Sequence, residues 1–373
     1  MHRKTKKVKL AVGKMDRKLL FSALTLTLIG LVAVADASAP SALSTFSDKY
    51  YFLKQQAVWS VIGIGGLIVT SHLNYKLWSK VATPLFGITV ILLIMVLIPY
   101  FAPNLLGARR WIVIGGFTFQ PSELAKITLI MYLAKVAESN KKAMSYFVPI
   151  GLVAGLIMLE PDLGTTIVLV IIGFSQIFIA GQDLIKIFIT GVVAFCMGLL
   201  LIVMSPYRKD RLVTFLEQTA DPLGKGYHIR QILYALGSGG MFGVGLGQSR
   251  QKYLFLPEAA NDSIFAVIAE EVGFVGALIL ISIIVYFVIR GIKIAYEAPD
   301  IFSRVLAIGI VAWIGGQAFV NIAAMVSLVP LTGIPLPFIS YGGSSLTAVL
   351  TGTGILLNIS KFANVKTQKR RIK

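Results

Sequence analysis

The chain has 373 residues, of which 56% are hydrophobic and 14% are charged, and it carries a formal net charge of +18 at pH 7. In soluble domains about a quarter of the residues are charged, so this composition, with a mean hydropathy of +0.80, excludes a soluble globular protein. It predicts an all-α polytopic membrane protein.

Apolar segments recur along the whole chain at about the length that a membrane-crossing helix needs, roughly 20 residues. We predict ten transmembrane helices. The fifth and sixth are the shortest, and the polar triplet at 160–162 separates them; without this break the number would fall to nine. The predicted spans are Leu19–Ala37, Gln56–Ser71, Val81–Tyr100, Pro121–Ala137, Tyr146–Leu159, Gly164–Ala180, Leu184–Ser205, Ser263–Arg290, Val305–Leu328 and Tyr341–Ser360.

The distribution of Lys and Arg predicts the orientation, because short cytoplasmic loops carry an excess of both. Residues 1–18 form a basic cytoplasmic N-terminus and residues 361–373 a basic cytoplasmic tail, on either side of a single membrane domain at 19–360. Together with anionic lipid headgroups, this topology accounts for most of the positive charge, so nucleic acid is not an expected partner. The cations assigned to inner loops are Lys76, Lys80, Lys141, Lys142, Lys186, Arg290 and Lys293.

Residues 206–262 form the longest predicted outer loop, between the seventh and eighth spans. Loops near this length escape the positive-inside rule, and a long loop in a compact protein is usually functional. Its glycine-rich stretch at 237–247 has two interpretations: a backbone that presents amides to phosphate, or a re-entrant turn packed on neighbouring helices. The cations of the loop favour an anionic ligand on the outer side; they are Arg208, Lys209, Arg211, Lys225, Arg230, Arg250 and Lys252.

The stretch GARRWIVIGGFTFQPSELAK at 107–126 leads from an outer loop into the fourth span. Pro121 suits the first turn of a helix, and Glu123 suits the positive end of the helix dipole. Glu123 and Lys126 lie three residues apart, so they share a helix face and can pair. A structural ion pair and a charged site at membrane depth are both open, and the two are compatible.

Other polar residues in the apolar segments have plausible structural roles. Asp162 is placed to cap the sixth span. Gln317 and Asn321 lie four apart in the ninth, which suits interhelical hydrogen bonds or the lining of a cavity. With the single cysteine Cys196 no disulfide can form within the chain, and the three histidines show no ligand spacing, so the sequence predicts no metal site.

Four acids gather in LPEAANDSIFAVIAEE at 256–271, where the outer loop meets the eighth span. Asp262 lies at the predicted outer mouth of this helix. Glu270 and Glu271 follow about 12 to 13 Å further along its axis, inside the span. Asp262 is a good helix cap; with Glu258 and the basic loop beside it, it is also a candidate general base. Spacing alone does not separate these two roles.

Five motifs, in chain order, closely resemble those of the SEDS family, the bacterial proteins of shape, elongation, division and sporulation. They are QPSELAK at 120–126, EPDLGTT at 160–166, GSGGMFGVGLGQSRQKYLFLPE at 237–258, the acid of NDSIFAVIAEE, and PLPFISYGGSS at 335–345. The resemblance spans almost the whole chain. GQSRQKYLFLPE and the ending GILLNIS are more similar to the FtsW division branch, with its sporulation relative, than to the RodA elongation branch.

The resemblance implies ten transmembrane helices with a large extracytoplasmic loop between the seventh and eighth. It also implies the polymerisation of lipid II into glycan strands, with release of undecaprenyl diphosphate. Asp262 matches the family's loop aspartate, proposed to deprotonate the acceptor 4-hydroxyl, so that the transfer inverts the donor's anomeric carbon. The positions expected to bind substrate are Arg109, Glu123, Lys126, Ser249, Arg250 and Lys252. The positions expected to support the site are Asp162, Glu258, Glu270, Gln317 and Asn321.

Ser263 departs from the family pattern, in which an aromatic residue often follows the aspartate. A divalent cation, Mg²⁺ or Mn²⁺, could assist, although the sequence supplies no ligand set for it. The partners implied are lipid II, a class B penicillin-binding protein, divisome membrane proteins and membrane lipids, at the division septum of the bacterial plasma membrane.

Three alternatives to a division polymerase are open. They are a lipid II flippase, a non-catalytic scaffold for a partner synthase, and an elongation or sporulation paralogue. An acid among cations at the outer surface is needed for polymerisation, but neither translocation nor a scaffold requires it.

Overall fold

The computed structural model describes residues 13–102, 109–114, 117–139, 144–204, 206–216 and 226–371. Helices make up most of this part of the chain, with one pair of short strands. The predicted loop cations Lys141, Lys142 and Lys225 lie outside it, as do most of the basic N-terminus and the last two residues of the tail. The elements are α1 (Arg17–Phe46), α2 (Tyr51–His72), α3 (Lys76–Leu97), β1 (Ile112–Ile114), β2 (Phe117–Phe119), α4 (Pro121–Glu138), α5 (Met144–Leu159), α6 (Leu163–Ile179), α7 (Leu184–Met204), α8 (Pro206–Leu216), α9 (Tyr227–Gly239), α10 (Ile264–Glu297), α11 (Ile301–Met325) and α12 (Gly343–Arg371).

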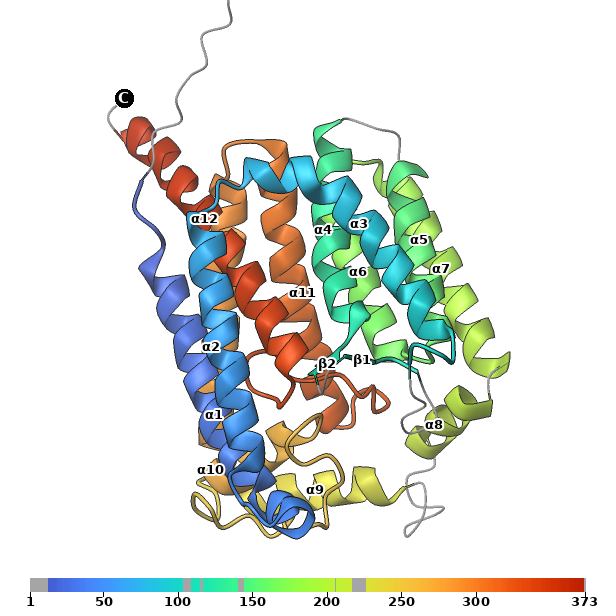
Figure 1. The fold of residues 1–373 in the computed structure, drawn as a ribbon, viewed down its shortest axis with the longest axis vertical. Coiled ribbons are helices and arrows are strands. Elements are labelled where there is room, and N and C mark those ends of the chain that lie inside the picture. Colours follow the sequence, from blue (N-terminus) through green and yellow to red (C-terminus); the bar gives the residue numbers. More distant parts are fainter. Residues whose placement is uncertain are drawn as a thin grey trace, which may run out of the picture.

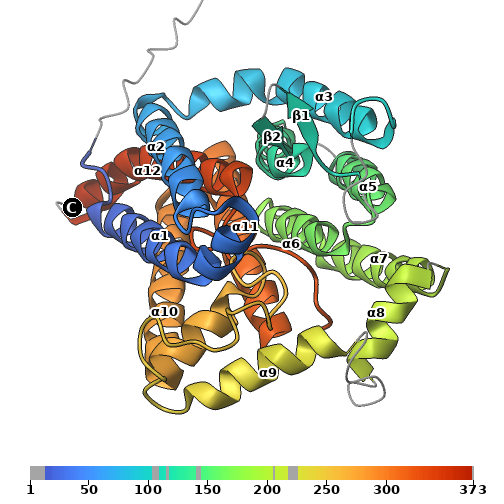
Figure 2. The same ribbon diagram turned by 60° about the horizontal axis from the view of Figure 1, so that its bottom comes forward.

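The helices form a bundle in which α11 is the central element (Figures 1 and 2). It packs against α4, α6, α10 and α12, and Trp313 in its middle is fully buried. α12 packs along α2, and a Cβ on Gly354 would lie 2.4 Å from Leu67 O. Small residues at such contacts let helix backbones approach closely. The core is therefore built around α11, the helix that carries the predicted polar pair Gln317 and Asn321.

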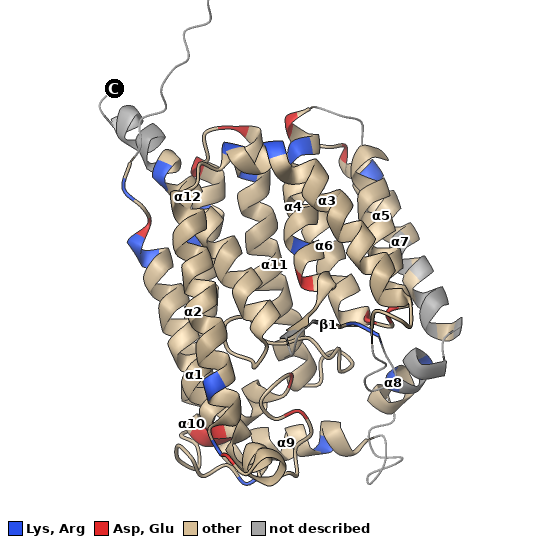
Figure 3. Ribbon diagram, in the orientation of Figure 1, with Lys and Arg blue, Asp and Glu red and all other residues tan. Residues whose placement is uncertain are grey.

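Each predicted span overlaps a helix. In the described part of the chain, six helices are long and apolar enough to cross a membrane, namely α1, α2, α3, α10, α11 and α12; α4 to α7 cover the other four predicted spans. Charged residues gather toward the two ends of the bundle (Figure 3). Gly13 N donates to Lys361 O at 2.7 Å, and Asp16 N donates to Ser360 Oγ at 3.0 Å. The start of α1 and the end of α12 therefore lie at the same end of the bundle, as an even number of spans requires.

Local sequence features explain several helix boundaries. Asp162 caps α6 by accepting a hydrogen bond from Thr165 N at 2.9 Å, as predicted. Asp300 forms a capping box at the start of α11, and Pro121 begins α4, also as predicted. The outer linker before α4 contains the antiparallel hairpin of β1 and β2, which the apolar pattern does not predict.

α10 is interrupted near its start. Gly273 has φ 68° and ψ −172°, a conformation open to glycine and strained for other residues. The predicted span Ser263–Arg290 is therefore not one continuous helix, and Glu270 and Glu271 both lie in its part before the break. The remainder of α10, residues 274–297, supplies about 36 Å of helix at 1.5 Å per residue, which alone is enough to cross a bilayer.

The long segment between α7 and α10 contains regular structure. α8 follows α7 directly, and α9 is amphipathic, with Ile229, Ile232 and Ala235 buried. α9 packs on α10, so the segment lies against the helix that begins just after Asp262.

Candidate active site

Asp262 lies directly before α10, where hydrogen bonds hold the backbone in place. Its carbonyl oxygen accepts from Asn321 Nδ2 at 2.9 Å. The carbonyl oxygens of residues 260 and 261 accept from Tyr341 N at 2.9 Å and from Ser340 Oγ at 2.7 Å. Three consecutive carbonyls are thus fixed by α11 and by the segment that follows it.

The carboxylate of Asp262 does not cap α10. The N-cap residue is Ser263, and no side chain makes a capping bond there, so the capping role that the sequence left open is wrong. The carboxylate lies near Gly333 instead: a Cβ built on this glycine would be 3.5 Å from Asp262 Oδ2 and 4.0 Å from Arg211 Nη1. The Asp262 carboxylate and the Arg211 guanidinium thus both lie beside Gly333, within contact distance of the position that a side chain there would take.

The electrostatic surroundings of Asp262 suit a base that works at neutral pH. Burial raises the pKa of Asp262 to about 7, with Glu258 and Asp162 adding to the rise and Arg211 and Arg110 opposing it. A carboxylate that is about half ionised near pH 7 can both accept and release a proton there. Asp162 and Glu258, two of the expected supporting residues, thus act on the charge of this acid.

Arg110 joins the start of the hairpin to the turn between α5 and α6. Its Nε donates to Glu160 O at 3.0 Å and its Nη2 to Pro161 O at 2.6 Å. Burial raises the pKa of Glu160 to about 9, with Asp162 adding to the rise, so this carboxyl is neutral at pH 7. The positive charge of Arg110 is therefore not cancelled by the acid nearest to it in this turn.

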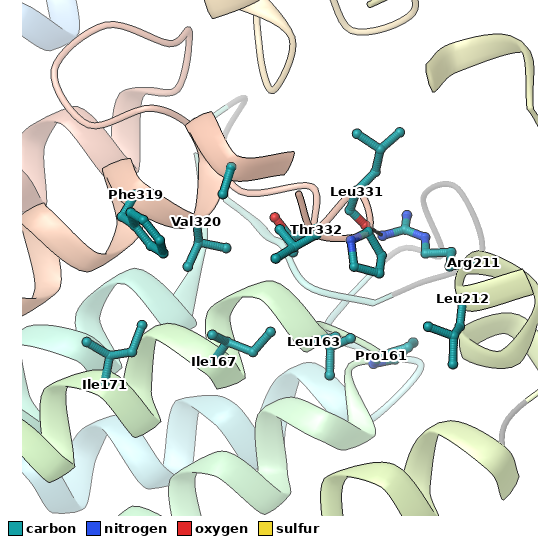
Figure 4. Close-up of a pocket in the computed structure, with 13 residues that line it drawn as sticks. Pro161, Leu163, Ile167, Ile171, Arg211, Leu212, Phe319, Val320, Leu331 and Thr332 are labelled. Atoms are coloured by element: carbon teal, nitrogen blue, oxygen red, sulfur yellow. Dashed lines mark hydrogen bonds between the residues drawn. The ribbon is translucent and has the colours of Figure 1, made fainter. Parts of the chain in front are cut away.

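An apolar groove of about 410 Å³ lies between α6, α8, α11 and the segment after α11 (Figure 4). Ile167 and Ile171 line it from α6, and Phe319 and Val320 line it from α11. Arg211 is the single charged residue among the described residues that line the groove. The groove therefore ends at the cation that also flanks Gly333, next to Asp262.

Glu123 and Lys126 form the predicted pair, deep inside the bundle. Lys126 Nζ donates to Glu123 Oε1 and to Gln317 Oε1, each at 2.8 Å. Gln317 also accepts from Trp313 Nε1 at 2.9 Å and donates from Nε2 to Pro335 O at 2.9 Å. Both charged side chains are at most 4% exposed, and neither lines the groove. Their role in substrate binding stays a prediction, while their contacts link α4, α11 and the segment after it.

The glycine-rich stretch forms a tight turn against the interrupted part of α10. Val244 N and Gly245 N donate to the carbonyl oxygens of Glu270 and Glu271, each at 3.0 Å. A Cβ on Gly243 would lie 2.0 Å from Glu271 O. The structure thus supports the interpretation of a re-entrant turn packed on a neighbouring helix.

The amides of this stretch do hold anions, but these anions are the chain's own carboxylates. Glu271 accepts from Gly247 N at 3.0 Å and from Ser249 N at 3.1 Å. Glu270 accepts from Arg250 N at 3.1 Å and from Ser249 Oγ. These amides are therefore already occupied, and the phosphate-binding interpretation does not apply to them.

Lys252 completes this cluster. Its Nζ lies 2.8 Å from Glu271 and 2.7 Å from Asp36 of α1, and its side chain is 3% exposed. Of the other residues expected to bind substrate, Arg250 has an exposed side chain and Arg109 a half-buried one. Contacts of Lys252, Arg250 and Arg109 with substrate stay predictions.

His228 of α9 contacts the residue that departs from the family pattern. Its Nε2 lies 2.8 Å from Ser263 Oγ. Burial lowers the pKa of His228 to about 4, with Arg211 adding to the effect, so the imidazole is neutral at pH 7. Ser263 thus takes part in a hydrogen bond that connects α9 to the start of α10.

Sequence reasoning missed four residues at this site. It named Arg211 only as one of the cations of the basic loop beside Asp262, and it assigned no role to Arg110, Gly333 or His228. The cations were visible in the sequence as exceptions to the positive-inside rule. Their positions depend on tertiary contacts between segments far apart in the chain.

The described part of the chain contains no group of three or more His, Cys, Asp or Glu residues placed to hold a metal ion. The carboxylate of Asp162 near the site accepts hydrogen bonds from Thr165 N at 2.9 Å and from Thr165 Oγ1 at 2.8 Å. A divalent cation that assists the reaction therefore stays a prediction, and no step is assigned to a metal.

The fold and the site define a polytopic helical membrane protein in which Arg211 lines an apolar groove and, with the acid Asp262, lies beside Gly333. The family model described as "Cell cycle protein", which covers FtsW, RodA and SpoVE, matches residues 17–365. The chain belongs to this family, as the motifs predicted.

Relatives of known sequence match nearly end to end. The "Probable peptidoglycan glycosyltransferase FtsW" of Trichlorobacter lovleyi is 41% identical over 94% of this chain and 94% of its own length. "Stage V sporulation protein E" of Bacillus subtilis is 40% identical over 93% of this chain and 97% of its own. These two similarities cover the division and sporulation branches of the family.

Solved structures share the fold. One, described as "Structural coordination of polymerization and crosslinking by a peptidoglycan synthase complex", has a TM-score of 0.76 and 28% identity, covering 94% of this chain and 98% of the solved one. The rod shape determining protein RodA of Thermus thermophilus has a TM-score of 0.69 and 28% identity, covering 93% and 96%.

Proposed function

We propose that this protein is a peptidoglycan glycosyltransferase that joins lipid II units into glycan strands at the outer face of the bacterial plasma membrane, for septal wall synthesis. The observation that carries the proposal is the position of Asp262. Its carboxylate and the Arg211 guanidinium both lie beside Gly333, and Arg211 also lines the apolar groove. Family membership and the names of the relatives support the same activity.

Asp262 is the general base of the proposed reaction. Its carboxylate takes the proton of the acceptor 4-hydroxyl as that oxygen attacks the donor's anomeric carbon. The new C–O bond forms on one face while the bond to the diphosphate breaks on the other, so the anomeric centre is inverted. A pKa of about 7 leaves much of Asp262 ionised at neutral pH and lets it release the proton afterwards.

The leaving group, undecaprenyl diphosphate, matches the other two features of the site. Arg110 and Arg211 supply positive charge where the diphosphate gains negative charge in the transition state, and guanidinium groups suit phosphate recognition. The apolar groove, walled by Ile167, Ile171 and Phe319, accommodates the isoprenoid next to the diphosphate. The donor's anomeric carbon is then held between Arg211 and Asp262.

The proposed topology has ten spans, cytoplasmic termini and the segment 206–262 outside. The hydrogen bonds that join residues 13 and 16 to residues 361 and 360 and the helices that overlap each predicted span support it. The proposed partners are lipid II, a class B penicillin-binding protein and divisome membrane proteins. The similarity to a chain solved in a peptidoglycan synthase complex supports a partner of the penicillin-binding class.

The test is polymerisation of labelled lipid II by the purified protein together with its penicillin-binding partner. Asp262→Ala is expected to lower the rate by about 10² to 10⁴-fold, the usual contribution of a general base. Asp48→Ala is the matched control, because Asp48 is an exposed acid that pairs with Lys54. Equal polymerisation by Asp262→Ala would refute the assignment of the base. Lipid II flipping without polymerisation by the wild type would favour the transport alternative.

A further inference from the structure

Two amide side chains on α11 hold the segment that follows this helix. Gln317 Nε2 donates to Pro335 O at 2.9 Å, and Asn321 Nδ2 donates to Ile334 O at 2.8 Å. Residues four apart on a helix lie on the same face, so the two amides grip consecutive carbonyls. The second hydrogen of the Asn321 amide goes to Asp262 O at 2.9 Å.

The same segment holds the backbone before Asp262. Ser340 Oγ donates to Asn261 O at 2.7 Å, and Tyr341 N donates to Ala260 O at 2.9 Å. Ser340 Oγ also accepts from Leu336 N at 2.8 Å, which folds the segment back on itself. We call residues 334–341 together with Asn321 the seat of Asp262.

We infer that Asn321 is a positioning residue for Asp262. It holds the backbone carbonyls of Asp262 and Ile334, and so fixes the carboxylate relative to Gly333. The inference rests on the proposed function, in which Asp262 is the base. It also gives a task to the PLPFISYGGSS motif, most of which forms the seat.

The orientation of the Asn321 amide follows from its surroundings. The side chain is buried, and its Oδ1 has no hydrogen-bond partner. The opposite orientation would place this oxygen against the two carbonyl oxygens of Asp262 and Ile334, where no donor exists. The orientation found leaves one buried acceptor without a partner, whereas the opposite one would also lose both donated hydrogen bonds, so the two carbonyls fix the orientation of this amide.

One amide therefore holds both Asp262 and the residue that follows Gly333. Ile334, whose carbonyl Asn321 holds, directly follows Gly333, and Gly333 has φ 70° and lies beside Asp262 Oδ2. Asp262 is held through its own carbonyl. Loss of the bridge frees the acid and the glycine to move relative to each other.

The chain contains a matched control for this device. Gln176 of α6 is also fully buried; its Nε2 bridges Ile130 O and Val305 O at 3.0 Å each, and its Oε1 has no partner. It ties together α4, α6 and α11 without contacting the seat. Gln176 and Asn321 are thus both buried amides that donate to two backbone carbonyls, and of the two only Asn321 contacts Asp262.

The experiment compares Asn321→Leu with Gln176→Met, each of which replaces the amide by an apolar group of similar size. Initial rates of lipid II polymerisation are measured from pH 5.5 to 9 and divided by the amount of folded protein. For Asn321→Leu we expect kcat to fall by about 10 to 100-fold, the scale of a misplaced catalytic group, with KM changed less than about twofold. Gln176→Met should keep the wild-type kcat.

The pH profile gives a readout that a general loss of stability does not move. The charged groups that face Asp262 are Glu258, Asp162, Arg211 and Arg110, and neither variant changes them. Burial chiefly holds the pKa of Asp262 near 7, so a looser, wetter carboxylate should shift the rising limb of kcat to lower pH in Asn321→Leu. In Gln176→Met the limb should stay where it is in the wild type.

Ser340→Ala is the second variant, in case Asn321→Leu does not fold. It removes the donor to Asn261 O and should give a smaller change in the same direction. The inference is overturned if both seat variants keep the wild-type kcat and pH limb per folded molecule. A wild type that makes no glycan would instead overturn the proposed function, and the inference with it.

Discussion

The pKa of Asp262 is set by what surrounds one carboxyl group. Burial is the main cause that raises this pKa to about 7. The nearby acids Glu258 and Asp162 also raise it, and Arg211 and Arg110 lower it. An ordinary aspartate has a pKa near 4. The same residue on an exposed loop would be fully ionised at neutral pH and would be a weaker base.

Polymerisation should therefore depend on pH through Asp262. Because the base must be ionised, the rate per folded molecule is expected to rise through pH 7 and, at pH 5, to be about 100-fold below its plateau, since each pH unit below the pKa costs tenfold. Initial rates measured with lipid II across this range test the expectation. A flat profile between pH 5 and 8 would contradict it.

Stability should change with pH in the opposite sense. The folded protein binds the Asp262 proton more tightly than the unfolded chain does, so this contribution to stability is complete below pH 4 and is lost as the pH rises through 7. Asp262→Asn, which cannot ionise, should lack that loss. Thermal unfolding of both proteins at pH 5 and pH 8 serves as the control for the activity profile.

At the scale of elements, the interruption of α10 makes room for the glycine-rich turn that precedes this helix. The turn at 240–245 pairs its backbone with residues on both sides of Gly273: Val244 N donates to Glu270 O at 3.0 Å and Phe274 N to Gly240 O at 2.9 Å. A Cβ on Gly273 would lie 2.2 Å from Gly243 N. The turn and the broken helix are thus one packed unit.

Gly273→Ala should break this unit. Its positive φ costs an alanine about 1 to 3 kcal/mol, and the close contact with Gly243 N adds to this, so the free energy of unfolding should fall by at least that amount. Gly155→Ala is the matched control, because a Cβ at this helical position of α5 meets nothing within 4 Å. Alanine favours a helix over glycine by up to about 1 kcal/mol, so this control should be as stable as the wild type or more so. Denaturant unfolding in detergent measures both.

The sequence predicted helices well and their interruptions poorly. Apolar runs and caps such as Asp162 placed a helix at every predicted span, since both are local features, but α1 continues nine residues past the predicted end at Ala37 and α12 eleven residues past Ser360. The break at Gly273 was missed because VGFVG reads as part of a continuous apolar helix. Only the contact with Gly243, thirty residues earlier, shows why the helix stops there.

At the scale of the whole molecule, a chain of buried contacts runs from α4 to the site. Glu123 binds Lys126, Lys126 binds Gln317, and Gln317 holds Pro335. The carbonyl of the preceding residue, Ile334, accepts from Asn321, which also donates to the carbonyl of Asp262. The ion pair inside the bundle and the acid at the groove thus belong to one connected network.

Lys126→Met should destabilise the protein strongly. It leaves Glu123 buried without its cation, which costs roughly 3 to 5 kcal/mol in comparable pairs. Lys126→Met combined with Glu123→Gln should recover most of this loss, because no buried charge then remains. Denaturant unfolding compares the wild type, the two single variants and the double variant, and additive losses in the double variant would contradict the expectation.

The pair at 123 and 126 was predictable from spacing, and Asp262 from its position among cations. The network between them was not, because it depends on Gln317 and Asn321 meeting a segment whose conformation no local pattern specifies. Resemblance supplied the role of the acid, and the tertiary contacts supplied the residues that hold it.

The seat of Asp262 also has a consequence for how the protein is made. The acid precedes α10, but its backbone is held by Asn321, Ser340 and Tyr341, all synthesised later. A nascent chain that ends at α10 carries the acid without the groups that place it. The surroundings of Asp262 are therefore complete only when the last third of the chain has been made, and a chain that stalls earlier is expected to enter the membrane without the proposed catalytic centre.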